Sequence, residues 1–255
     1  MQSERLLSLA RRLLAIPTDN NTADTWLCEH SERVQRLALH LASLPALRHL
    51  NVDRGALEAA ALFHDAGWVV EYHQGKWKRW QLLSRPTSDI QRELGAALLK
   101  EEGAPLLPPQ TTRLACEAIR QCNSRHARSA EAQLLAEAEA LDEVSTLHIL
   151  RQFRLYQGEG RPIQQLVDTW KRQREYRFWD SRLADGFRFE LTRELARRRL
   201  ADVDAFLGSL ARDLGGTDLR GALDASGAVT PPADASDASG TPAGAGSERH
   251  DQRRP

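Results

Sequence analysis

The chain has 255 residues, and its 35 Lys and Arg residues balance its 35 Asp and Glu residues, so the formal net charge is zero. A balanced charge argues against a broad electrostatic surface for nucleic acid or for acidic lipid. The three cysteines form no CxxC pair, which argues against a disulfide framework, and no stretch approaches the roughly 20 apolar residues that cross a bilayer. The composition predicts a soluble cytoplasmic protein without a membrane partner.

Apolar residues at helical spacing predict three helices in the first part of the chain. The first occupies most of residues 1–16. The second begins near Thr22 or Asp24, either of which suits an N-cap. The third starts after Asp53, and Gly67 is a suitable stop for its C-terminal end.

The helical pattern is interrupted at residues 68–86, where three tryptophans stand among charged side chains. We interpret this segment as an irregular flap or lid. Ser88 then suits the N-cap of a helix that runs to about Glu102, and another helix is expected over about 111–122.

The remaining helices are predicted from caps and proline positions. Ser129 suits the start of one long helix that continues to Leu150, and Pro162 fits the first turn of the next. A last helix is expected near 188–213.

The end of the chain has a different composition. From residue 214 to 255, Gly, Ala, Ser, Asp, Thr and Pro dominate, with almost nothing large and apolar to bury. The sequence therefore predicts an all-α fold, with a helical-bundle domain over 1–213 and a disordered low-complexity tail over 214–255.

Two histidines fall on apolar helix faces. His30 is in line with Leu27 and Val34, and His64 is in line with Leu57. A buried imidazole needs a partner; for any one histidine this is usually another core group, but a metal ion is a second possibility. His64 is followed directly by Asp65, so two inward imidazoles and a carboxylate are expected near one helix end.

A further ligand is expected from an acidic helix later in the chain. Glu139 and Asp142 are three residues apart and share a helix face, whereas Glu137 points elsewhere. Imidazole nitrogens combined with carboxylate oxygens suit Mn, Fe, Co, Ni or Zn better than Ca.

These residues stand in segments that resemble a known family. The segments HSERV (30–34) and AAALFHDAG (59–67) resemble the two opening motifs of the HD-domain metal-dependent phosphohydrolases. AEALD (138–142) resembles the family's last motif, and residues 190–207 are similar to the closing helix of a small bacterial branch of uncharacterised HD hydrolases. The resemblance covers about residues 22–212.

The resemblance implies a helical bundle and a metal-bound water that attacks phosphorus in a phosphoester. It implies His30, His64, Asp65 and Glu139 as ligands, with Asp65 also catalytic. Glu139 stands where the family has an Asp, so Asp142 is the alternative ligand.

The resemblance also implies how many ions are bound. The branch with two metal ions carries further histidines, and at the matching places this chain has Gln91 and Gln121-Cys122. We therefore expect at most one divalent transition metal.

Other site residues are expected around these ligands. Some branches place a general acid just after the His-Asp pair, so Glu71 and His73 are catalytic candidates, with a solvated loop as the alternative. Guanidinium, ammonium and imidazole groups suit a phosphate; the candidate substrate-binding residues are Arg33, Lys76, Arg125 and His126. Trp77, beside Lys76, either stacks on a base or clamps the flap onto the core.

The function expected from this pattern is a metal-dependent phosphohydrolase acting on a small phosphorylated molecule, with a nucleotide as a candidate. The alternative is a catalytically degenerate HD module that binds a ligand or partner, because Glu139 departs from the family pattern and the extra histidines are missing. Guanosine tetraphosphate hydrolysis is less favoured, because residues 68–71 lack the Glu-Asp pair of that branch.

Overall fold

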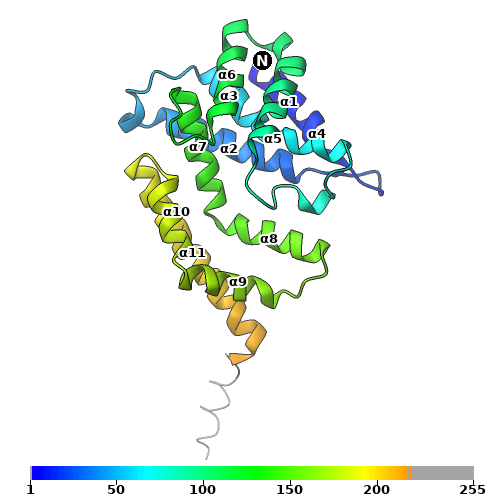
Figure 1. The fold of residues 1–255 in the computed structure, drawn as a ribbon, viewed down its shortest axis with the longest axis vertical. Coiled ribbons are helices and arrows are strands. Elements are labelled where there is room, and N and C mark those ends of the chain that lie inside the picture. Colours follow the sequence, from blue (N-terminus) through cyan, green and yellow to red (C-terminus); the bar gives the residue numbers. More distant parts are fainter. Residues whose placement is uncertain (1, 218, 220–255) are drawn as a thin grey trace, which may run out of the picture. The chain divides into compact units, whose positions relative to one another are not determined.

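The computed structural model describes residues 2–217 and 219, and nearly all regular structure in them is helical, as the sequence predicts (Figure 1). The α-helices are α1 (Gln2–Leu14), α2 (Trp26–Ser43), α3 (Arg54–Phe63), α4 (Gly67–His73), α5 (Asp89–Leu98), α6 (Pro109–Gln121), α7 (Ala130–Glu143), α8 (Thr146–Gly158), α9 (Gln164–Glu175), α10 (Phe178–Gly186) and α11 (Glu190–Gly215). Shorter elements are the paired strands β1 (Ile16–Pro17) and β2 (Ala23–Asp24), the 3-10 turns Pro45–Leu47, Arg79–Gln81 and Ala104–Leu106, and a π-helical turn, Leu99–Gly103.

The chain divides into two units after Gly215. The predicted tail, 214–255, lies almost entirely outside the described residues. No helix in the described part of the chain has the length and apolar character that crossing a membrane requires.

Side-chain caps fix three helix starts where the sequence predicts them. Asp53 accepts a hydrogen bond from the backbone of α3, and Ser129 does the same for α7. Ser88 caps α5, and Gln91 bonds back to the Ser88 amide to complete a capping box. These contacts lie within four residues, so they are readable from the sequence.

Two expectations about the first half need correction. Gly67 begins α4 and does not end α3, and residues 68–73 of the expected flap are helical. The reason is close packing, because a Cβ on Gly67 would lie 2.0 Å from the backbone oxygen of Gln91 in α5. The second half of the flap is held by Trp77, which packs against the buried Trp68.

Two expectations about the second half also need correction. The long helix expected from Ser129 to Leu150 is two helices, because the backbone leaves the helical conformation at Val144 and Ser145. Helix α10 was not predicted; it begins after Arg177, whose φ of 54° lies in the left-handed region although the residue is not a glycine.

Helix α3 is the centre of the bundle. It packs against α2, α6 and α7, and its residues from Ala56 to Phe63, except Glu58, are buried. Helix α4 packs on α5, α8–α11 pack on one another, and α8 and α11 also pack on α7 (Figure 1). The C-terminal end of α3 therefore delivers His64 and Asp65 to the interior of the protein.

Candidate metal centre

Three predicted ligands meet at the end of α3. His30 from α2 places its Nε2 atom 3.2 Å from Nε2 of His64 and 3.2 Å from Oδ2 of Asp65. The same oxygen is 3.5 Å from Nε2 of His64. All three residues are at most 2% exposed, so three potential donor atoms converge among buried side chains.

The hydrogen bonds of the two Nδ1 atoms determine whether the Nε2 atoms of His30 and His64 carry a lone pair or a hydrogen. Nδ1 of His30 lies 2.8 Å from Oδ2 of Asp142, and Nδ1 of His64 lies 2.8 Å from the backbone oxygen of Ala61. Because these oxygens accept, each Nδ1 carries a hydrogen, and the neutral rings direct Nε2 lone pairs at each other and at Asp65. Such a convergence of acceptors needs a positive charge at its centre.

Without a metal ion, protonation of His30 would supply this charge. Burial disfavours the imidazolium of His30, but its bonds to Asp142 and Asp65 outweigh burial and raise its pKa. Burial lowers the pKa of His64, which therefore stays neutral.

The donor atoms also fit a metal ion. Ligands about 2.1 Å from a tetrahedral ion are separated by about 3.4 Å, close to the 3.2–3.5 Å found here. The set His30, His64 and Asp65 matches transition-metal preference, and three protein ligands leave a position open for water or substrate, as in catalytic sites.

Asp142 lies behind His30. Besides its bond to His30 Nδ1, it accepts bonds from Arg33 Nε at 2.9 Å and from Arg151 Nη2 at 3.2 Å. Burial opposes its charge, but His30 and Arg33 hold the pKa of Asp142 well below its usual range. A carboxylate in this position fixes the tautomer and orientation of a ligating imidazole, so Asp142 orients His30 from the side opposite to the donor cluster.

Asp65 is fixed through its other oxygen. Oδ1 accepts bonds from Thr87 Oγ1 at 2.7 Å and from Arg92 Nη1 at 2.8 Å. Thr87 in turn accepts a bond from the buried indole of Trp68. Burial opposes ionisation, but the neighbouring histidines and Arg92 hold the pKa of Asp65 well below its usual range. Only Oδ2 therefore faces the two imidazoles.

Glu139, the fourth predicted ligand, is not part of the three-residue group. Its Oε1 accepts a bond of 2.5 Å from Nη2 of Arg92. The extra methylene of Glu relative to Asp carries the carboxylate to the arginine, which also contacts Asp65. Glu139 remains 26% exposed and lines the cavity described next.

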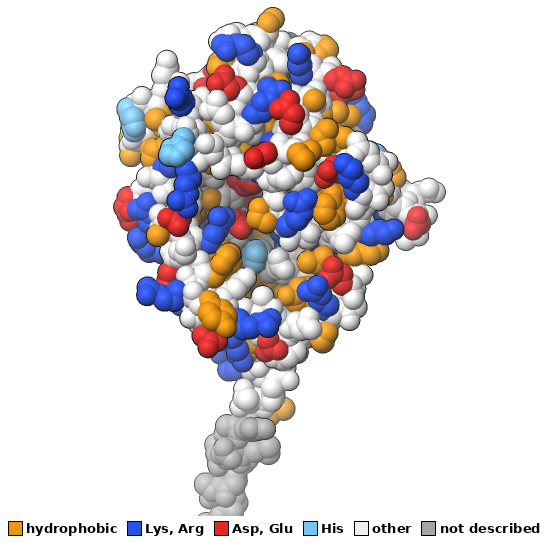
Figure 2. Space-filling view, in the orientation of Figure 1, with side chains coloured by type: hydrophobic (Ala, Val, Ile, Leu, Met, Phe, Trp, Pro, Cys, Tyr) orange, Lys and Arg blue, Asp and Glu red, His pale blue; other side chains and the backbone are white. Residues whose placement is uncertain are grey.

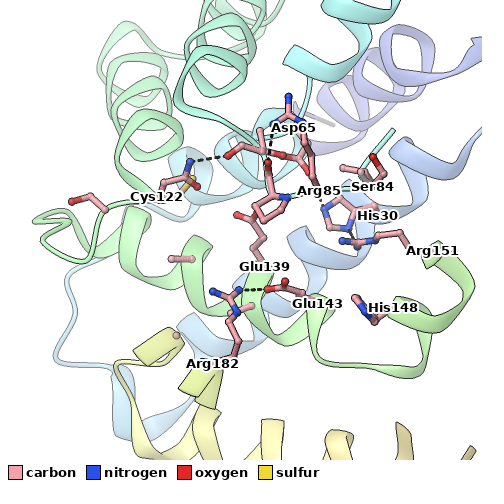
Figure 3. Close-up of a pocket in the computed structure, with 18 of the residues that line it drawn as sticks. His30, Asp65, Ser84, Arg85, Cys122, Glu139, Glu143, His148, Arg151 and Arg182 are labelled. Atoms are coloured by element: carbon pink, nitrogen blue, oxygen red, sulfur yellow. Dashed lines mark hydrogen bonds and ion pairs between the residues drawn. The ribbon is translucent and has the colours of Figure 1, made fainter. Parts of the chain in front are cut away.

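A cavity of about 420 Å³ opens onto His30 and Asp65 (Figure 3). Figure 2 shows basic side chains at several points around a hollow on this face. The arginines that line the cavity are Arg85, Arg125, Arg151, Arg182 and Arg188. Arg182 pairs with Glu143 and Arg125 with Asp185. Within residues 2–217, no carboxylate lies within ion-pair distance of Arg85 or Arg188, so these two charges are available to an anionic ligand.

The predicted catalytic residues Glu71 and His73 do not line this cavity. Glu71 is buried and accepts bonds from Trp77, Gln91 and Lys76. These bonds occupy its carboxylate and fasten the segment after α4 to α5. His73 is exposed and contacts Tyr72. The sequence spacing placed both residues near the His-Asp pair, but neither lines the cavity that opens onto His30 and Asp65.

Of the predicted substrate-binding residues, only Arg125 lines the cavity. Lys76 pairs with Glu71 instead. Arg33 donates to Asp142, which in turn contacts His30. Arg33 is therefore linked to the donor cluster only through Asp142. His126 is exposed in the loop before α7 and does not reach the cavity wall.

Several residues of the site were missed from the sequence. Arg92 gave one readable signal, since it shares a helix face with the buried Gly95 and Ala96, where a charged residue is unusual. Thr87 precedes an N-cap, which gives no indication of its bond to Asp65. The basic residues of α8, α10 and the turn before α11 carry no motif.

Comparison with known proteins gives a family match for part of the chain and a shared fold. Residues 27–144 match the family model of the HD domain. The structure of YpgQ from Bacillus subtilis is similar, with a TM-score of 0.52 and 19% identity over 84% of this chain and 96% of YpgQ. YpgQ in complex with ADP gives a TM-score of 0.53 and 17% identity over 84% of this chain and 98% of that one. At these identities the likeness shows a shared fold. Among curated proteins, none matches the sequence.

Proposed function

Because residues 27–144 of this chain match the family model of the HD domain, we propose that the protein is a metal-dependent phosphohydrolase acting on a small phosphoester. The observation that carries the proposal is the convergence of His30, His64 and Asp65 donor atoms at the inner end of an arginine-lined cavity. Lone pairs that converge on one point favour a bound cation, and the arginines around the cavity favour an anionic group beside it.

Each residue of the centre has a defined task in this proposal. His30, His64 and Asp65 hold one divalent ion, which when bound lowers the pKa of water and neutralises phosphate oxygens. Asp142 keeps the Nε2 lone pair of His30 directed inward. Thr87 keeps Oδ2 of Asp65 directed inward by binding its other oxygen.

The cavity favours a phosphorylated molecule of nucleotide size. A volume of about 420 Å³ lies within the range of roughly 300–1,000 Å³ for small-ligand sites. Arg85 is held over the rings of Trp68 and Trp77, and the Arg188 guanidinium donates to the backbone of Ser124. Both retain donors for phosphate oxygens. The ADP complex of YpgQ, which has the same fold, supports a nucleotide as the candidate.

One observation favours a second candidate function, a non-catalytic HD module that binds a phosphorylated ligand or a partner. Glu139 stands at the position of a family ligand but bonds to Arg92, so the centre has three protein ligands and not four. Such a module would bind metal or nucleotide without turnover.

Elemental analysis of the purified protein, followed by a panel of phosphoesters and nucleotides, tests the proposal. The native protein should contain a transition metal and hydrolyse at least one of these compounds. Asp65→Asn and His64→Ala should lose both properties, whereas Glu93→Gln, which removes an exposed carboxylate paired with Arg120, should retain both. Activity retained in both ligand variants would refute the proposal, and ligand binding without turnover would favour the second candidate.

A further inference from the structure

We propose that Arg92 is a built-in cation that restricts this centre to one metal ion with three protein ligands and keeps Glu139 outside its coordination sphere. The inference rests on the proposed function only in requiring that His30, His64 and Asp65 bind metal. It assigns to Arg92 and Glu139 a role that the sequence motifs do not give them.

The first argument comes from the carboxylate of Asp65. A carboxylate that bridges two metal ions must offer one oxygen to each. Here Oδ1 accepts bonds from Thr87 at 2.7 Å and from Arg92 at 2.8 Å, so only Oδ2 is available for coordination. Asp65 is therefore a ligand to one ion, and the place beside Oδ1 where a second ion would sit is occupied by a guanidinium.

The second argument comes from Glu139. Nη2 of Arg92 binds Glu139 Oε1 at 2.5 Å while Nη1 binds Asp65. One guanidinium thus links the two carboxylates, as its fork of parallel donors allows. A second divalent ion would be attracted to the same pair of carboxylates if Arg92 were absent. With Arg92 present, one of their two negative charges is already balanced, and Glu139 is the counterion of an arginine.

The third argument is that Arg92 cannot move aside. Its side chain is 1% exposed, and it also donates to the backbone oxygen of His64 at 3.1 Å and to Asn123 Oδ1 at 3.3 Å. Asn123 bonds to the backbone oxygen of Thr87, whose hydroxyl binds Asp65. The ring of bonds closes on itself, so the positive charge is as fixed as a bound ion.

Titration of the native protein with Mn²⁺ to saturation, with the bound ions counted by native mass spectrometry, tests the inference directly. One ion per chain is expected. Two ions per chain would overturn the inference and leave the proposed function standing. No bound ion would overturn the proposed function and this inference with it.

Variants then test the role of Arg92. Arg92→Met leaves two carboxylates without their cation, so it should bind a second Mn²⁺ or bind the first about ten-fold more tightly. Arg92→Met combined with Glu139→Gln removes both charges of the pair and should return to one ion with an affinity within about three-fold of the native value. Unchanged binding by the single variant would overturn the inference. So would loss of metal in the double variant to the level of Asp65→Asn, because Glu139 would then be a ligand.

Circular dichroism shows whether the Arg92→Met chain folds. If it does not, Arg92→Lys replaces it, since an ammonium keeps the positive charge but binds one carboxylate at a time. Arg92→Lys should still bind one ion, and two ions in that variant would overturn the inference.

Discussion

Asp142→Asn separates an orienting role of this residue from a ligating one. Asp142 contacts Nδ1 of His30 at 2.8 Å, on the side of the ring away from the donor cluster. The amide can accept the same hydrogen bond but has no charge with which to strengthen the imidazole as a ligand. Loss of such a carboxylate behind a metal-bound histidine lowers metal affinity by about 10–100-fold.

The expected size of the effect can be worked out for melting experiments. At a metal concentration one hundred times the native dissociation constant, binding stabilises the native protein by about 2.7 kcal/mol. A 10–100-fold weaker site leaves about 1.4 to 0.4 kcal/mol at the same concentration. For a domain of this size each kcal/mol corresponds to about 2–4 °C, so the metal-induced rise in Tm should fall from about 5–11 °C to about 1–6 °C.

Differential scanning calorimetry with and without Mn²⁺ measures this change. Asp24→Asn is the matched control, because Asp24 is also an arginine-bound aspartate, paired with Arg154, but does not contact His30. The control should keep the native metal response. Two results would refute the reasoning: an unchanged response in Asp142→Asn, or a response abolished at every metal concentration, which would make Asp142 a ligand.

Three further outcomes are expected. Arg85→Ala should raise KM for the phosphoester by about ten-fold without changing metal affinity; steady-state kinetics showing only a lower kcat would contradict its assignment to phosphate binding. The pKa of His148 is lowered to about 4, mainly by burial and also by the charge of Arg151. In the unfolded chain the pKa has its ordinary value of 6.5, so as the pH falls the unfolded chain binds the proton before the folded protein does. Stability should therefore be lost between pH 6.5 and 4, by about 3 kcal/mol, and urea denaturation of His148→Gln should lack this loss. Gly67→Ala would place a Cβ 2.0 Å from the Gln91 backbone oxygen and should destabilise the fold by about 3 kcal/mol, and a native-like urea midpoint would show that α4 and α5 separate easily.

The parts of the fold that were predictable from the sequence depend on contacts between near neighbours. Ser88 and Ser129 cap their helices through amides three residues on, and a sequence displays such patterns directly. The break at Val144 lies where α8 packs back on α7, and α10, which starts after Arg177, packs on α9 and α11. Neither position has a glycine or proline to mark it.

The residues of the candidate site also fall into those that the sequence predicts and those that only the folded chain brings together. His30 and His64 were identified because helical periodicity puts each on a buried face, and Asp65 because it adjoins His64. Arg92 donates to Asp65 and Glu139, which are 27 and 47 positions away in the sequence. Only the folded chain displays these contacts. Glu71 was assigned by spacing alone, and spacing does not say which way a short helix turns its side chains.

The walls of the cavity are formed by two stretches of the chain, one inside the HD-domain match and one after it. The donor atoms of the candidate metal centre lie within residues 27–144, whereas His148, Arg182 and Arg188 on the opposite wall lie beyond them. Buried Glu137 joins the two stretches by accepting bonds from the Arg188 amide and the Thr192 hydroxyl at the start of α11. Substitutions in α8–α11 can therefore change which molecules enter while the donors stay in place. This second wall is therefore the informative region to compare among proteins that share the three donors.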